Sequence, residues 1–415
     1  MPAVILALAL ASPAAAQSEP LLRTTGRTET GFFFEIADNN SIAILLYFGE
    51  DQEVVIPERI QGLPVTSICG HYYWEPFAGN SITRVTIPSS VSSIKTGVFN
   101  RDRGLTDIIV DKDNPVYADI DGVLFDKKIR TLIQYPKGRQ ARSYDIPASV
   151  TAIGHYAFHD SPLAAITIPP SVTSIGAAAF GRCKNLTAMT LPPSLTAIKE
   201  AAFYEFPLES IIIPSSVTSI GDRAFIDAAL TSVTIPPSVT SIGASAFSSC
   251  ENLASVTIPS SVTSIGSYAF AFSGLTKVTI PPSVTSVGEG AFFRCKSLTS
   301  VTLPPAITAI WQNTFAETPL TSVTIPSSVT SIGEKAFEYC KDLTSLTIPP
   351  SVTSIGKQAF YVCKSLTSVT IPLSVTSIGE EAFRGCGSLL TATLSRQTSV
   401  ENDAFPKKTQ IIYSD

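Results

Sequence analysis

The sequence predicts an α/β repeat solenoid, and three observations support this fold class. Nearly identical segments recur along the chain, as in IPPSVTSIGAAAF from Ile168 and IPSSVTSIGEKAF from Ile325. An Ile-Pro or Leu-Pro step returns every 22 or 23 residues between Pro147 and Pro372. Each period carries the same spaced set of apolar residues. A period in the twenties indicates a stack of short chain turns, or rungs, which bury their apolar residues against their neighbours.

Each element of a rung can be predicted from residues 343–363. Leu346 and Ile348 alternate with polar residues, which predicts a short strand with one buried and one exposed face. Pro349 ends that strand because proline cannot donate to a strand ladder. A second apolar pair predicts a second short strand, Gly356 predicts a turn, and the AFxxC segment predicts a short helical turn. We count about 14 such rungs of the leucine-rich type.

Composition and the N-terminus narrow the class of protein. The chain has 415 residues, 44% hydrophobic and 15% charged, with a net charge of −5. These values exclude a disordered chain and a general nucleic-acid-binding surface. Residues 1–16 predict a signal peptide, because an apolar run is followed by small residues before Gln17. We expect no transmembrane segment and a secreted or cell-surface location, with the periplasm as the alternative.

The rung resembles the BspA-like, or treponemal-type, leucine-rich repeat, whose pattern is close to LxxIxIPxxVxxIGxxAFxxCxx. The match extends over about residues 28–410, nearly the whole mature chain. The resemblance implies a right-handed superhelix with a face of parallel strands. It also implies a secreted or surface-exposed binding protein, often an adhesin-like one.

Two further segments resemble features of that family. The segment that begins GFFFEIADNN is similar to the N-terminal cap of the family. The segment DNPVYADIDGVLFDKKIR is similar to its β-hairpin insertion, which accounts for the 59-residue gap between Pro88 and Pro147. The expected parts are a signal peptide (1–16), an N-terminal β cap (17–56), first rungs (57–100), the hairpin insertion (101–145), the regular array (146–394) and a C-terminal cap (395–415).

Six of the seven cysteines occupy one repeat position, three residues after the recurring phenylalanine. They are Cys183, Cys250, Cys295, Cys340, Cys363 and Cys386. We expect small side chains buried under the turn. The alternative is a disulfide or metal role for Cys340, Cys363 and Cys386, because adjacent rungs would bring them within bridging distance. Cys69 lies outside this series.

The sequence offers little for catalysis. His155 and His159 have zinc-like i, i+4 spacing, but no third ligand accompanies them, so we expect both on a solvated surface. Four aspartates cluster between residues 111 and 121, but their spacing does not fit a calcium loop. No GxSxG, HExxH, CxxC or glycine-rich phosphate motif occurs. We therefore expect no catalytic residues, no metal and no cofactor.

The first candidate partner-binding surface is the set of outward side chains on the predicted strands, which we call the strand face. It comprises Ser232, Thr234, Ser255, Thr257, Lys277, Thr279, Ser300, Thr302, Ser322, Thr324, Ser345, Thr347, Ser368 and Thr370. We expect this face to be concave and to carry an extended sheet. The alternative is that threonine is simply a favourable exposed strand residue.

The second candidate surface consists of aromatic residues near the turns. These are Tyr204, Phe272, Phe293, Trp311, Tyr339 and Tyr361. All but Trp311 follow the recurring phenylalanine by one or two residues, and Trp311 replaces the usual turn glycine, as Lys199 also does. Exposed aromatics are typical binding anchors, although scattered surface aromatics are also normal.

These observations favour an exported, non-enzymatic binding protein, adhesin-like and monomeric. The expected partner is a protein or glycan, such as host extracellular matrix or a mucosal surface, and not nucleic acid. The alternative is a purely structural or spacer solenoid in a surface layer or larger assembly. The regularity of the rungs favours the spacer, whereas the breaks at Lys199, Trp311 and residues 101–145 favour the binder.

Overall fold

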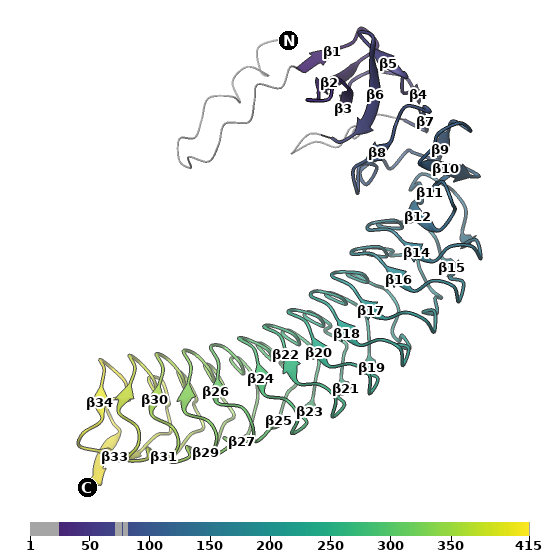
Figure 1. The fold of residues 1–415 in the computed structure, drawn as a ribbon. Helices are drawn as coiled ribbons and strands as arrows, with labels where there is room; N and C mark the ends of the chain where they lie inside the picture. Colours follow the sequence, from purple (N-terminus) through teal and green to yellow (C-terminus); the bar gives the residue numbers. More distant parts are fainter. Residues whose placement is uncertain (1–24, 71–76, 78–81, 415) are drawn as a thin grey trace.

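The computed structural model describes residues 25–70, 77 and 82–414. The expected signal peptide, residues 1–16, lies outside these residues. The described part of the chain forms an arc of about 16 stacked turns spaced by about 23 residues, with β1 at one end of the arc and β33 and β34 at the other (Figure 1). No membrane-spanning helix occurs in the described part.

The N-terminal region is a mixed sheet that leads into the first rungs. Its strands pair in the order β1-β2-β3-β6-β5, with β8 beside β6. The β1–β2 and β2–β3 pairs are antiparallel, whereas β3, β6 and β8 run parallel and begin the solenoid. The bounds are β1 (Thr25–Arg27), β2 (Phe32–Ile36), β3 (Ile42–Tyr47), β5 (Arg59–Ile60), β6 (Leu63–Ile68) and β8 (Ser93–Ile94).

Next follow a three-stranded parallel sheet and an antiparallel hairpin. The sheet pairs β4 (Glu53–Val55), β7 (Arg84–Ile87) and β9 (Asp107–Val110). The hairpin pairs β10 (Tyr117–Ile120) with β11 (Val123–Asp126), and β11 continues antiparallel to β12 (Thr131–Gln134). Because β12 then pairs parallel with β14, the hairpin is hydrogen-bonded to the regular array.

The regular array contains two series of short parallel strands. The first series carries the strand face: β13 (Ser143–Asp145), β15 (Ala165–Thr167), β19 (Ser232–Thr234), β21 (Ser255–Thr257), β23 (Lys277–Thr279), β25 (Ser300–Thr302), β27 (Ser322–Thr324), β29 (Ser345–Thr347), β31 (Ser368–Thr370), β33 (Thr391–Ser395) and β35 (Gln410–Ser414). The second series is β14 (Ala152–Ile153), β16 (Ser174–Ile175), β17 (Ala197–Ile198), β18 (Ser219–Ile220), β20 (Ser241–Ile242), β22 (Ser264–Ile265), β24 (Ser286–Val287), β26 (Ala309–Ile310), β28 (Ser331–Ile332), β30 (Ser354–Ile355), β32 (Ser377–Ile378) and β34 (Ser399–Val400).

The core is a continuous ladder of identical side chains. One phenylalanine from each rung forms a column in which neighbouring ring centroids lie 5.0–5.7 Å apart. We call it the phenylalanine column: Phe158, Phe180, Phe203, Phe225, Phe247, Phe270, Phe292, Phe315, Phe337, Phe360, Phe383 and Phe405. Stacking therefore supplies each rung with the burial that it cannot achieve alone.

The predicted α/β class and its short helical turns are wrong, because no helix occurs among the described residues. In the turn around Phe225, Arg223 and Asp227 are left-handed, with φ of 55° and 57°. Their N–H groups donate to the carbonyls of Ala244 and Ser248 in the next rung, over 2.8 and 2.9 Å. Hydrogen bonds between rungs thus replace the bonds that a helix would make within one segment. The fold is a parallel-strand β-solenoid.

The repeated glycine has a different role from the one expected. Gly356 does not have a positive φ, so it is not required for turn flexibility. A Cβ on Gly356 would lie 2.7 Å from the backbone nitrogen of Glu334 in the preceding rung. Glycine therefore permits close stacking of adjacent backbones. Where Lys199 and Trp311 replace it, the turns keep the same left-handed positions, at residues such as Ala201 and Asn313.

Candidate partner-binding surfaces

The strand face is exposed and in register. All fourteen of its side chains are exposed, while the valine or leucine between each pair points inward. Parallel pairing places Ser232 opposite Ser255 and Thr234 opposite Thr257, and β27 and β29 repeat this alignment. The expected extended sheet is wrong, because the strands of this face pair only within the groups β19-β21, β23-β25, β27-β29 and β31-β33-β35. The strand face is therefore a row of short sheets with Ser and Thr at equivalent positions.

The expected concave position of the strand face is wrong. Figure 1 shows β19, β21, β23, β25, β27 and β29 along the outer side of the arc, with the turn segments along its inner edge. The strand face and the turn side each contain one segment per rung. The arc therefore curves toward the side on which neighbouring segments lie closer together. The turns stack closely through the glycine contacts described above, and the strand face is accordingly convex.

The hydroxyls of the strand face are available to a partner. No Ser or Thr hydroxyl of the strand face has a hydrogen-bond partner among the described residues. Threonines just before the strands differ, because Thr299 Oγ1 donates to the Thr276 carbonyl over 3.3 Å and Thr344 Oγ1 to the Thr321 carbonyl over 3.1 Å. The strand face therefore offers many weak hydrogen-bonding groups and no large apolar anchor.

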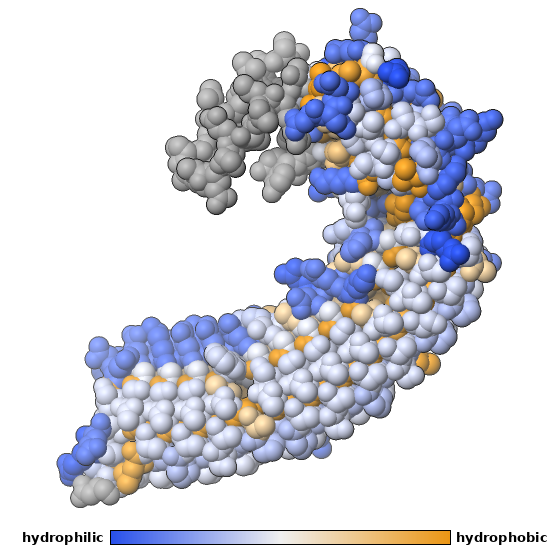
Figure 2. Space-filling model, viewed as in Figure 1, coloured by the Kyte–Doolittle hydropathy of each residue, from blue (hydrophilic) through white to orange (hydrophobic). Residues whose placement is uncertain are grey.

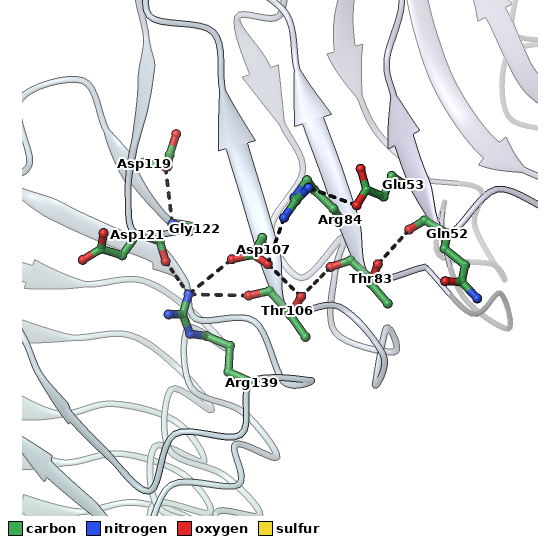
Figure 3. Close-up of polar contacts among 10 residues, drawn as sticks. All are labelled: Gln52, Glu53, Thr83, Arg84, Thr106, Asp107, Asp119, Asp121, Gly122 and Arg139. Atoms are coloured by element: carbon green, nitrogen blue, oxygen red, sulfur yellow. Dashed lines mark hydrogen bonds and ion pairs between the residues drawn. The ribbon is translucent and has the colours of Figure 1, made fainter.

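The N-terminal continuation of the strand face is charged rather than neutral, and Figure 2 shows hydrophilic residues on the outer side of the arc at this end. Figure 3 shows Arg84 between Glu53 and Asp107, at 3.0 and 3.9 Å, and Arg139 at 3.8 Å from Asp107. Arg139 also donates to the carbonyl of Asp121. These partly exposed ion pairs link β4, β7, β9 and the hairpin, and each contributes at most about 1 kcal/mol. This end of the face therefore differs from the array in carrying paired charges.

Four of the six aromatic candidates lie in two edge-to-face pairs. Phe272 and Phe293 have ring centroids 5.3 Å apart at 87°, and Tyr339 and Tyr361 have centroids 5.6 Å apart at 83°. Arg294 lies over both phenylalanine rings, at 5.7 and 5.2 Å from their centroids. The Nζ atom of Lys341 lies similarly over Tyr339, at 5.7 Å from the ring centroid. Such contacts hold the cations in place beside the rings.

A hollow of about 510 Å³ is lined both by Arg294, which lies over the phenylalanine pair, and by Tyr339 of the tyrosine pair. It is lined by Arg294, Lys296, Glu317, Thr318, Pro319, Tyr339, Lys341 and Asp342. Arg294 Nε lies 2.8 Å from Glu317 Oε2 on its wall. We call Phe272, Phe293, Arg294, Tyr339, Lys341, Tyr361 and this hollow the turn surface. It combines apolar rings, fixed charges and a concavity, which the strand face does not.

The structure does not bring the other two aromatic candidates to the turn surface. Trp311 is 55% exposed and follows β26, where it packs near Leu303 and Ile307. Tyr204 is half-buried, and its hydroxyl hydrogen-bonds to Nε2 of His159.

A second hollow, of about 660 Å³, lies between the rung of residues 96–103 and the start of the regular array. We call it the basic hollow. It is lined by Thr96, Gly97, Asn100, Arg101, Arg103, Lys137, Tyr156, His159, Asp160 and Arg182. Sequence reasoning missed this site, because its cations come from three separated segments and no local motif links them.

The expectation that His159 lies on a solvated surface is wrong. The imidazole packs between Tyr204 and Lys137, whose Nζ lies 3.2 Å from its Nδ1. Burial, reinforced by the ammonium of Lys137, lowers the pKa of His159 from 6.5 to about 4. His155 is exposed, and its Nδ1 accepts a hydrogen bond from the N–H of Ala177. The two histidines therefore lie in the same turn but contact different rungs.

Stability should fall at acidic pH because of His159. Unfolding restores the ordinary pKa of 6.5, so between about pH 6.5 and pH 4 the unfolded chain binds more protons than the folded chain. We expect His159 to remove about 2–3 kcal/mol of unfolding free energy between about pH 7.5 and pH 4.5. Urea unfolding of wild type and His159→Gln at both pH values measures the difference. An equal pH dependence in the two proteins would contradict the assignment.

The clustered aspartates of the hairpin organise its backbone. Asp119 Oδ1 accepts from the N–H of Val110 over 2.8 Å, and Asp111 Oδ1 accepts from the N–H of Asp113 over 2.8 Å. The described residues contain no group of three or more His, Cys, Asp or Glu side chains that could hold a metal ion.

All seven cysteines are free thiols. The six repeat cysteines are buried, and each Sγ donates to the carbonyl of a phenylalanine in the preceding rung over 3.0–3.3 Å. Burial raises the pKa of Cys183 and Cys250 to about 12, and of Cys295 and Cys340 to about 11. The six buried thiols thus cap carbonyl groups of the turns.

The buried thiols should resist alkylation in the folded protein. A thiolate is the reactive form, so raised pKa values and burial both slow the reaction. We expect Cys69, which is half-buried, to react first and the other six only on unfolding. Mass spectrometry after brief iodoacetamide treatment, with and without urea, counts the labelled sites. Rapid labelling of Cys340 in the native protein would contradict this role.

Stacked parallel strands, a phenylalanine column and a 22–23-residue period define a leucine-rich-repeat solenoid. The chain belongs to the family described as the BspA type leucine rich repeat region. Six copies of the family model match, over residues 71–130, 137–229, 218–344 and 330–414. The resemblance seen in the sequence is therefore confirmed.

One solved structure shows the same fold, and two others are similar in sequence over most of the chain. A leucine-rich repeat protein from Bacteroides ovatus is 23% identical, with a TM-score of 0.58, and the match covers 96% of this chain and 100% of that one. A leucine rich cell surface protein from Faecalibacterium prausnitzii is 25% identical over 96% of each chain, with a TM-score of 0.46. The pneumococcal vaccine antigen PcpA is 18% identical over 94% of each, also with a TM-score of 0.46. No curated protein matches the chain.

Proposed function

We propose that this leucine-rich-repeat protein is an exported, non-enzymatic binding module that holds a protein or glycan partner against its turn surface. The observation that carries the proposal is the pairing of exposed aromatic rings with fixed cations, because Arg294 and Lys341, which contact these rings, both line one hollow. Export is supported by the predicted signal peptide at residues 1–16. The expected partners are extracellular, such as matrix proteins or mucosal glycans.

The turn surface has the features of a binding anchor. Phe272 is 37% exposed and Tyr339 is 38% exposed, so both rings present large apolar area to solvent. Their edge-to-face partners and the adjacent cations restrict them, which lowers the entropy lost on binding. Aromatic and arginine side chains supply most of the energy in protein interfaces. In a glycan complex, the same rings would pack on sugar C–H groups.

The strand face is the weaker candidate for the primary contact. Its hydroxyls hydrogen-bond to water in the free protein, so replacing water by a partner yields little net energy per group. Its convex shape also reduces the area that a globular partner can cover. It fits a secondary contact along an extended ligand better than an anchor.

A spacer role is the second proposal, and the regularity of the ladder favours it. The phenylalanine column runs without interruption from Phe158 to Phe405, so the array resists bending. A rigid rod holds its ends at a fixed distance whether or not its surface binds anything.

Binding of the purified chain from residue 17 onward to an array of matrix proteins, mucins and glycans tests the proposal. We expect saturable binding at micromolar or better affinity for at least one ligand, and loss of this binding in Tyr339→Ala. A folded, monodisperse protein that binds nothing on the array would contradict the binding proposal and favour the spacer role.

A further inference from the structure

The basic hollow has no part in the turn surface, yet its composition is unusual for this chain. Four cationic side chains and a single carboxylate line it among the described residues, whereas the whole chain has a net charge of −5. The four cations are Arg101, Arg103, Lys137 and Arg182.

We propose that the basic hollow binds an acidic sugar unit, that is, a pyranose carrying one carboxylate or sulfate group. The local excess of positive charge attracts a single anionic group. The overall negative charge of the chain disfavours a long polyanion such as nucleic acid. The volume is also in the range of sites for small ligands.

Lys137 provides a fixed cation at the wall of the hollow. Its side chain is only 4% exposed, and its Nζ lies 3.7 Å from Asp160 Oδ2 and donates to the carbonyl of Asn100. A nearly buried ammonium acts through a less polar medium than a surface lysine does. It therefore favours an anion in the hollow without requiring rearrangement.

Two arginines at the rim can contact the anion directly. The side chains of Arg103 and Arg182 are 79% and 41% exposed, and each already lies near one carboxylate, at 3.3 Å from Asp160 and 3.5 Å from Glu205. A guanidinium has five donors, so each arginine can keep that contact and still donate to a carboxylate or sulfate oxygen.

The remaining wall suits a sugar ring. Tyr156 lines the hollow and is 37% exposed, and its ring lies at 72° to that of His159, with centroids 5.8 Å apart. The Oδ1 atom of Asn100 is buried and has no hydrogen-bond donor among the described residues. A rotation of the Asn100 side chain would bring this acceptor to a sugar hydroxyl while the pyranose packs on the tyrosine.

Calorimetric titration of the protein with 3′-sialyllactose, galactose 6-sulfate, lactose and inorganic sulfate tests the proposal. We expect at least one acidic sugar to bind about tenfold or more tightly than lactose and sulfate do. The affinity for this sugar should fall at high salt. The double variant Arg103→Gln/Arg182→Gln should lose that preference. Both side chains are exposed enough for the variant to fold, which circular dichroism verifies.

Two controls separate this site from the turn surface. The variant Arg223→Gln removes an exposed arginine of the neighbouring array and should bind the acidic sugar as wild type does. Tyr339→Ala should also bind it normally, even if it loses the partner of the turn surface. Equal affinity for lactose, equal affinity for inorganic sulfate, or full binding by the double variant would each overturn the proposal.

Discussion

Replacing Phe270 by alanine is expected to cost about 3–5 kcal/mol of unfolding free energy. Phe270 is fully buried, and its ring centroid lies 5.4 Å from that of Phe247 and 5.6 Å from that of Phe292. The substitution removes two stacking contacts and leaves a cavity between rungs. Since each rung contacts only its neighbours, the defect should divide the array into two less cooperative parts.

Urea unfolding followed by circular dichroism measures this cost, and hydrogen exchange locates the opened rungs. Phe272→Ala is the matched control, because it changes the same residue type two positions away at an exposed site. We expect it to cost less than about 1 kcal/mol. Equal destabilisation by the two variants would show that the column is not the main support of the array.

The sequence was sufficient for the period, the strands and the buried positions. Alternation around Leu346 predicted an inward leucine between two exposed residues, and the structure has that pattern at β29. These predictions succeed because the period, the strands and the buried positions depend on the apolar pattern within a single rung.

The turns and the curvature needed information from neighbouring rungs. The AFxxC segment has apolar residues at helical spacing, but alternate N–H groups bond to the next rung, and two residues four positions apart, such as Arg223 and Asp227, are left-handed. The convex strand face likewise follows from close glycine contacts between rungs. The sequence of a single repeat does not show whether its N–H groups form hydrogen bonds within the turn or with the next rung.

The basic hollow was missed for a related reason. Lys137 is 34–36 residues from Arg101 and Arg103, and 45 from Arg182. Only stacking of the rungs that flank the hairpin brings them together. The turn surface was partly visible, since the aromatic positions could be read from the repeat, but their pairing across adjacent rungs could not.

Removing the aromatic anchors should affect binding far more than changing the strand face. For a ligand identified on the array, Phe272→Ala/Tyr339→Ala is expected to weaken binding about 100-fold or more, because two anchor rings each contribute about 2 kcal/mol or more. Ser322→Ala/Ser345→Ala removes two hydroxyls from the strand face. It should weaken binding less than about fivefold, because these hydroxyls exchange water for the partner at little gain.

Surface plasmon resonance with the ligand immobilised compares the two variants directly. Both change exposed residues in the same half of the array, so differences in folding do not distort the comparison. Anchor loss should appear mainly as faster dissociation, since interface substitutions act chiefly on that rate. If the serine variant weakens binding more than the aromatic variant, the primary contact is the strand face. The partner would then have to be an extended or concave molecule that follows the outer side of the arc.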